Sequence, residues 1–203
     1  MKKITPELSE IIGLLCAEGS HIISYCSYWC NDQGRFRFRK DDKSERIEFS
    51  NKDKKLLFHY QSLLSKEFNY NPKITKHSKV NICKMSIINM IINYTKLGHL
   101  KWKVPKAIIN SDQNNKIAFL RGYFDGDGTV SNIIRMFSTN KKGLKQVSKL
   151  LKDLKIKHTI PNPEIKENRK PCYIVAISRK ERERFLKLIK PVSKRPDLCE
   201  GNH

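Results

Sequence analysis

The chain has 203 residues, a length that fits one domain or two small domains joined together. It carries 41 Lys and Arg against 20 Asp and Glu, and 38% of its residues are hydrophobic. This apolar content is enough to form a core and excludes a disordered polycation. The formal net charge of +21 predicts a polyanionic partner, most often nucleic acid. A ribosome-like basic protein and a membrane-surface binder are the alternatives.

Neither a membrane protein nor a secreted one is expected. No apolar run is long enough to cross a bilayer, and the first ten residues, MKKITPELSE, turn polar too soon for a signal peptide. The sequence therefore predicts a soluble intracellular protein, in a prokaryotic cytoplasm or an organelle matrix, with no membrane partner.

Six cysteines, at positions 16, 26, 30, 83, 172 and 199, form no CxxC pair. Without a leader they are expected to be reduced thiols. Cys26 and Cys30 near His21, and Cys199 near His203, are candidate zinc ligands, but neither group has a matching second pair. A zinc site is the less favoured interpretation.

The first half of the chain predicts helices and strands in the order αββαββα. Pro6 suits the first helical position after Thr5, and Ser50 with Asp53 resembles a capping box before the second helix. The expected elements are a helix from Thr5, a hairpin over about 21–50, a helix containing residues 56–64, strands over about 72–75 and 79–85, and a helix over 86–94.

The second half repeats that order after a connector rich in polar residues. The expected elements are a helix over about 116–126, a hairpin over 129–138, a helix over 141–154, strands over 158–161 and 173–178, and a helix over 179–189. The chain is therefore expected to contain two related halves, residues 1–98 and 116–203, joined by a linker over 99–115.

The stretch GRFRFRK, Gly34 to Lys40, alternates with a period of two, as a strand does. Phe36 and Phe38 are expected to pack on helices, which leaves three arginines on the other face. Those arginines either lie in solvent, where their charges keep an edge strand from aggregating, or contact a negative ligand. Because no acid is interleaved with them, the second interpretation, a face that contacts phosphates or bases, is favoured.

A nine-residue pattern occurs twice, as IIGLLCAEG from Ile11 and LRGYFDGDG from Leu120. Each copy has glycine third, an acid eighth and glycine ninth, and similar segments follow both copies. An Asp-Gly turn explains part of the second copy. An EF-hand loop does not, because Val130 and Met136 stand where it needs Gly and Glu.

Small residues four apart suggest how the two copies meet. Gly13 and Ala17 lie on one helix face, and Gly122 and Gly126 lie on one face of the other helix. Two such faces are expected to pack closely, so that the eighth residues emerge side by side. Neighbouring carboxylates repel unless a cation lies beside them, and Mg²⁺ takes such ligands and activates water for phosphodiester hydrolysis.

These two stretches resemble the LAGLIDADG motif, and nearly the whole chain resembles a monomeric LAGLIDADG homing endonuclease. The resemblance implies an α+β fold of two pseudo-twofold αββαββα repeats, with the motif helices at the central interface. Two antiparallel sheets would form a saddle over the DNA major groove. The implied activity is hydrolysis of both strands of a long asymmetric DNA site by a protein encoded in an intron.

The resemblance also implies roles for individual residues. Glu18 and Asp127 would bind Mg²⁺, or another divalent cation such as Mn²⁺, with Ala17 and Gly126 beside them. Asp125 aligns with Cys16 and is interpreted as a structural acid. Catalytic roles at the strand ends would fall to Asn51, Lys52, Thr139 and Lys141, and DNA contacts to Arg35, Arg37, Arg39, Lys40, Arg46 and, less clearly, Arg135.

The two halves are not expected to be equivalent. An internal alignment matches Thr139 and Asn140 with Asn51 and Lys52, so the second half has no lysine at the matching place.

Three other functions stay open. A maturase of this fold would bind intron RNA and assist splicing, and a non-catalytic DNA-binding regulator would be expected to have lost one acid. Both acids are present here, which favours the nuclease. An intein is less favoured, because the chain starts with Met and is short for an added splicing domain.

Overall fold

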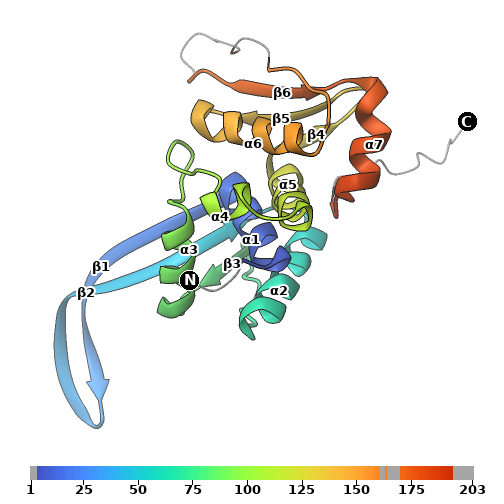
Figure 1. Ribbon diagram of the computed structural model, residues 1–203. Helices are drawn as coiled ribbons and strands as arrows, with labels where there is room; N and C mark the ends of the chain where they lie inside the picture. The colour runs from blue at the N-terminus through green and yellow to red at the C-terminus, as the bar shows by residue number, and fades with distance from the viewer. Residues whose placement is uncertain (1–3, 161–162, 164–169, 194–203) are drawn as a thin grey trace, which may run out of the picture.

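The computed structural model describes residues 4–160, 163 and 170–193, and the fold is built twice around a central pair of helices (Figure 1). The elements of the first half are α1 (Pro6–Glu18), β1 (Gly19–Asp32), β2 (Arg35–Ser50), α2 (Lys54–Phe68), β3 (Lys79–Ile82) and α3 (Met85–Tyr94). The remaining elements are α4 (Lys106–Ile109), α5 (Gln113–Asp127), β4 (Gly128–Val130), β5 (Ile134–Ser138), α6 (Lys141–Asp153), β6 (Tyr173–Ile177) and α7 (Arg179–Ile189).

The α+β class is confirmed, with two antiparallel sheets of order β1-β2-β3 and β4-β5-β6. Among the described residues, however, each half has one strand fewer than expected. The predicted strands at 72–75 and 158–161 are reduced to single bridges, Ile74 to Val80 and Thr159 to Ala176. Pro72 has no N–H to donate, and the chain turns back at once through Ser78, whose φ is 56°. Residue 161 lies outside the described residues.

Side-chain caps fix where the main helices begin. Thr5 accepts a hydrogen bond from the Leu8 amide at 3.1 Å, with Pro6 in the first turn, as predicted. The expected capping box at Ser50 is wrong: Ser50 ends β2, and Asp53 caps α2 by accepting from the Lys55 amide. Asp112 caps α5, which therefore starts at Gln113, three residues earlier than predicted.

Two hydrophobic clusters fill the molecule, and α1 contributes to both. Its residues Leu14 and Leu15 pack with α2, β2, β3 and α3, whereas Ile12 packs with α5 and the second half. The connector contains the short helix α4. Its Trp102 is buried in the cluster formed with α5 and the second half. The exact limits of the two halves stay a prediction. No helix in the described part of the chain is long and apolar enough to span a membrane.

The β1–β2 hairpin projects far from the helices (Figure 1). Its strands have 14 and 16 residues, but β3 pairs with β2 only from Ile47 to Ser50. Phe36 and Phe38 lie beyond this covered part and are 75% and 52% exposed. The expectation that they pack on helices is therefore wrong, because the strands continue past the end of the core.

Candidate active site

The two motif helices pack backbone against backbone. A Cβ atom built on Gly13 would lie 2.2 Å from the Phe119 carbonyl oxygen, and one on Gly122 would lie 2.3 Å from the Glu10 oxygen. Only glycine fits at either place without moving a helix. This confirms the close approach predicted from the small residues.

Both motif acids lie at the ends of these helices. Glu18 is the last residue of α1 and Asp127 the last of α5, and each chain continues directly into a strand. A Cβ on Gly126 would lie 2.3 Å from the Ala17 Cβ and 3.3 Å from the Glu18 Cγ, so the helix ends adjoin. The acids open into two different pockets, each also lined by the seventh motif residue of the other helix.

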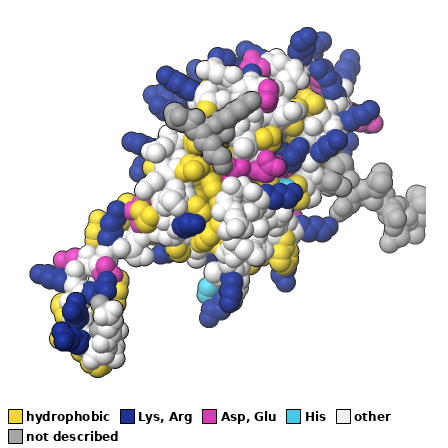
Figure 2. All heavy atoms as spheres, turned by 60° about the horizontal axis from the view of Figure 1, so that its bottom comes forward, with side chains coloured by type: hydrophobic (Ala, Val, Ile, Leu, Met, Phe, Trp, Pro, Cys, Tyr) yellow, Lys and Arg dark blue, Asp and Glu magenta, His cyan; other side chains and the backbone are white. Residues whose placement is uncertain are grey.

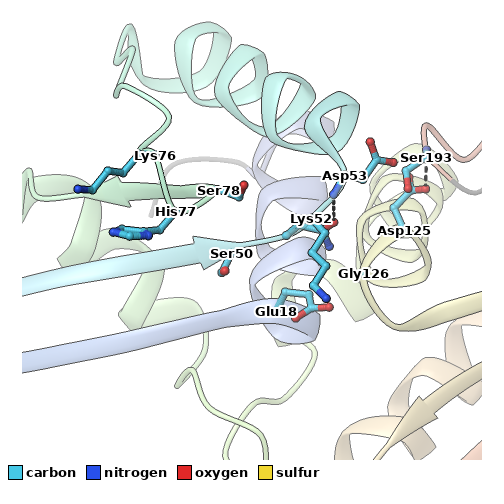
Figure 3. A pocket seen from close by; sticks show the side chains of 11 residues that line it. Glu18, Ser50, Lys52, Asp53, Lys76, His77, Ser78, Asp125, Gly126 and Ser193 are labelled. Carbon is cyan, nitrogen blue, oxygen red and sulfur yellow. Dashed lines mark hydrogen bonds between the residues drawn. The ribbon is translucent and has the colours of Figure 1, made fainter.

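The Glu18 pocket has a volume of about 820 Å³. Asn51 and Lys52 reach it from the end of β2, and Figure 3 shows the Lys52 side chain extending toward the Glu18 carboxylate. Lys76 and His77 also line it, from the turn before β3. Sequence reasoning missed these two residues, although the pairing of Ser50 with Lys79 places their turn beside the strand end.

The Asp127 pocket is smaller, about 260 Å³, and combines both halves of the chain. Ala17 reaches it from α1 and Thr139 from the end of β5. His99, from the connector, also lines it, and the Lys170 Nζ lies 3.0 Å from the His99 Nε2. No sequence motif pointed to His99, because only folding brings the connector to this pocket. Ser138 and Cys172 also line it and were missed.

Strand pairing corrects the internal alignment of the two halves. Gly19 pairs with Phe49 and Gly128 with Met136, so Phe49 and Met136 are equivalent. Counting on from them by two and three residues matches Asn51 with Ser138 and Lys52 with Thr139. The sequence alignment was therefore one residue out, because it superposed two Phe-Ser pairs that are not equivalent. The missing lysine is real: Thr139 stands where the first half has Lys52.

The contacts of two predicted catalytic residues, Lys141 and Asn51, bear on the roles expected of them. The Lys141 ammonium lies 5.4 Å from the centre of the Tyr173 ring, and Lys141 is not among the residues lining the Asp127 pocket. Asn51 uses its side-chain oxygen to accept from the Asp53 amide at 2.9 Å, which holds the turn into α2.

Asp125 makes contacts of the kind expected for a structural acid. It is 1% exposed, and its two carboxylate oxygens accept hydrogen bonds from the amides of Val192 and Ser193, at 2.9 and 3.0 Å. These bonds fasten the segment after α7 to the motif helix. At the equivalent place Cys16 is buried, and burial raises the pKa of its thiol, so it stays protonated.

The donors at the helix ends fit a hydrated magnesium ion better than a protein-only metal cage. Within the described residues no three His, Cys, Asp or Glu side chains form a metal-binding group, at Cys26 and Cys30 or elsewhere. Cys199 and His203 lie outside those residues. Mg²⁺ keeps several waters and needs only one or two carboxylates together with substrate phosphates. Glu18 and Asp127 lie at the helix ends, and they would supply such oxygen ligands together with the carbonyls of Ala17 and Gly126.

The arginines of β2 share one face of the hairpin. Arg37 pairs with Cys30 and Arg39 with Tyr28, and alternation along β1 puts these positions on the same face as Ile22, the partner of Arg46. That face is opposite the buried side chains of Ile47 and its neighbours. Arg35 continues the row, whereas Lys40 lies in the irregular stretch between Arg39 and Asp42.

The second sheet presents a basic residue in the same way. Arg135 is exposed between the buried Ile134 and Met136, so it lies on the face turned away from the core. A contact between Arg135 and DNA stays a prediction. Figure 2 shows Lys and Arg side chains over much of the visible surface, including the projecting hairpin.

Residues 114–190 match the family model of the LAGLIDADG-like domain. Variants of the homing endonuclease I-DmoI superpose with a TM-score of 0.65 and 19% identity, covering 91% of this chain and 96% of theirs. I-DmoI in complex with DNA and Mn gives 0.64 and 20%, with the same coverage. I-SmaMI, bound to an uncleaved DNA target with calcium ions, gives 0.54 and 14%, covering 94% of this chain and 86% of that one.

Curated relatives match at the sequence level over a small part of their own length. The DNA polymerase of Thermococcus kodakarensis is 24% identical over 179 residues, which is 85% of this chain and 10% of the polymerase. The DNA polymerase of Methanocaldococcus jannaschii is 25% identical over 195 residues, 92% of this chain and 11% of that protein. The chain spans about a tenth of each polymerase. The second half of the chain thus matches a LAGLIDADG-like domain, and the chain as a whole shares the fold of I-DmoI.

Proposed function

We propose that this protein is a site-specific endonuclease that hydrolyses both strands of duplex DNA with Mg²⁺ or a similar divalent cation. The observation that carries the proposal is the pair of pockets at the central helix interface. Each pocket combines a motif acid with the end of the second strand of the hairpin that follows the motif, β2 or β5. Because one chain supplies both pockets, we expect it to act as a monomer on an asymmetric site.

The basic surface explains how the DNA would be held. Arg35, Arg37, Arg39 and Arg46 share one face of the first sheet, and Arg135 lies on the outward face of the second. Arginine makes paired hydrogen bonds to guanine in the major groove and to phosphates. With a net charge of +21, we expect affinity to fall steeply with salt.

The pocket residues have separate roles in this proposal. Glu18 and Asp127 would hold the cation, which when bound supplies an activated water and neutralises charge on the phosphate. Lys52 would stabilise the negative charge that develops on the phosphate beside Glu18. Thr139 has no charge to offer at the equivalent place, and Lys170, whose ammonium lies 3.0 Å from His99 of that pocket, would offer positive charge to the second strand.

The comparisons support this function over the alternatives. I-DmoI and I-SmaMI are each described bound to DNA with a divalent cation. The polymerase matches carry no polymerase activity to this chain, because they cover only a tenth of each polymerase. A regulator of the same fold would not need both acids in open pockets. A gene position inside an intron is a further part of the proposal.

A library of randomised duplex DNA tests the proposal. Wild-type protein in Mg²⁺ should cut a defined site, whereas the Glu18→Gln/Asp127→Asn double variant should cut none. Equal cutting by both proteins would exclude the two acids as the catalytic centre. A lack of cutting by wild-type protein that still binds one duplex site would favour the regulator.

A further inference from the structure

Glu48 is an acid on the outward face of the first sheet. It lies on β2, the middle strand of that sheet, between the fully buried Ile47 and Phe49. Because side chains alternate along a strand, Glu48 and Arg46 share the face turned away from the core. The proposed function turns this face toward DNA, where phosphates would repel a carboxylate.

Two cations hold the Glu48 carboxylate in place. The Lys79 Nζ, from β3, donates a hydrogen bond to Oε1 at 2.8 Å, and the Arg46 Nε lies 3.9 Å from Oε2. The second distance is that of an ion pair and is too long for a hydrogen bond. A carboxylate oxygen accepts more than one hydrogen bond, so Oε2 keeps the capacity to accept from a donor on a ligand.

Stability alone does not account for an acid at this place. Ion pairs between partly exposed side chains contribute little to folding. Removal of a negative charge from this face would favour the binding of any polyanion. Glu48 therefore weakens the attraction to every phosphate, and only a hydrogen-bond donor on the DNA would offset that effect. The bases offer such donors in the major groove.

We propose that Glu48 recognises a cytosine in the major groove and so determines the base preferred at one position of the target. This inference rests on the proposed function. The N4 amino group of cytosine donates to a carboxylate, whereas the amino group of adenine lies beside N7, an acceptor that would repel Oε2. The guanine of the same base pair presents O6 and N7, to which Arg46 or Lys79 can donate. An acid held between two cations thus matches the edge of a C·G pair.

The position of Glu48 on β2 places this base pair near the centre of the target. Ser50, two residues farther along the strand, lines the Glu18 pocket (Figure 3). Arg35, Arg37 and Arg39 lie at the other end of β2, in the projecting part of the hairpin. The cytosine is therefore expected between the cut made at Glu18 and the bases that these arginines would contact.

Selection of binding sites from randomised duplex DNA, without a divalent cation, tests this inference separately from cleavage. Wild type should select cytosine at one position near the centre of its site. Glu48→Gln should lose this preference by at least about 10-fold and favour adenine instead, because a glutamine amide pairs with N6 and N7 of that base. The preferences at other positions should stay as in wild type.

Glu45→Gln is the matched control. Glu45 also lies on β2 and binds two basic side chains, Lys43 at 2.6 Å and His21 at 2.8 Å. It is three residues from Glu48, so alternation places it on the opposite face of the sheet. Both variants remove one negative charge, but Glu45→Gln should select the same sequence as wild type.

A modified base gives a readout that does not depend on the folding of a variant. Wild type should bind at least about 10-fold more weakly when a cytosine analogue without the amino group replaces the selected cytosine. Equal binding of the two duplexes would overturn the proposal. An unchanged preference for cytosine in Glu48→Gln, or an affinity raised equally for every sequence, would also overturn it. Wild-type protein that selects no duplex site would contradict the proposed function itself.

Discussion

At the scale of single residues, the two halves share a motif position but not its surroundings. Glu18 shares its pocket with Lys52, whereas the position equivalent to Lys52 in the second half is Thr139. Asp125 lies two residues before Asp127 and borders the Glu18 pocket, but its carboxylate accepts hydrogen bonds from two backbone amides. Neighbouring carboxylates thus have different tasks, which only their contacts reveal.

Replacement of Lys52 by Met should affect one strand more than the other. The lysine is expected to stabilise phosphate charge only in the Glu18 pocket, so we expect that strand to be nicked on the order of 100-fold more slowly. The other strand should be cut at nearly the wild-type rate. Gel analysis of a duplex with differently labelled strands measures both rates, with the exposed Lys55→Met as control. Equal slowing of both strands would contradict separate pockets.

Replacement of Asp125 by Asn should reduce stability and leave the chemistry intact. One of the two buried hydrogen bonds would be lost, and the new amide group would face a backbone N–H. The expected loss is about 1–3 kcal/mol in the free energy of unfolding, measured by urea titration. Magnesium-dependent cleavage at a temperature where the variant is folded should persist. A stable variant without cleavage would instead make Asp125 a metal ligand.

At the scale of elements, the interface between α1 and α5 depends on glycine. Gly122→Ala would place a methyl group 2.3 Å from the Glu10 carbonyl oxygen and 2.9 Å from the Leu14 amide nitrogen. Both neighbours are backbone atoms and cannot rotate away. We expect a loss of at least about 1–3 kcal/mol in stability. Asn114→Ala, an exposed site on the same helix, serves as the control, and a Gly122→Ala variant as stable as this control would contradict the packing.

The arginine row of β2 should contribute to sequence recognition. Arg37→Ala removes a side chain from the outward face of the hairpin, so we expect relaxed base preference in one half of the target only. Selection of binding sites from a partly randomised target measures this preference position by position. A uniform loss of affinity for all sequences would make Arg37 a phosphate contact.

The motif helices could be predicted from sequence because each is specified within nine consecutive residues. Spacing placed Gly13 and Gly122 on the helix faces that meet, and it placed the acids at the helix ends. The pocket partners could not be predicted in this way, because His99 and Lys76 reach the acids only through folding. The hairpin could be predicted only in part. Alternation correctly assigned the arginines and the phenylalanines to opposite faces, but no local sequence feature indicated that Phe36 and Phe38 lie beyond the core.

At the scale of the whole molecule, the two halves of the chain are unequal. The first sheet has a long projecting hairpin, whereas β4 and β5 have only three and five residues. α1 ties the halves together by packing into both hydrophobic clusters, and Arg121 of α5 binds Glu10 of α1 at 2.8 Å. An asymmetric protein of this kind suits a target site whose two halves differ.

The central proposal is that the motif acids cut DNA, and the most direct test compares Asp127→Asn with wild type on one target duplex. Cleavage in Mg²⁺ and binding without a divalent cation should be measured on the same preparation. We expect Asp127→Asn to bind DNA within a few-fold of wild type and to make no double-strand break, because the amide is a poor ligand for the cation. Double-strand cleavage at the wild-type rate in this variant would contradict the proposed role of the acids.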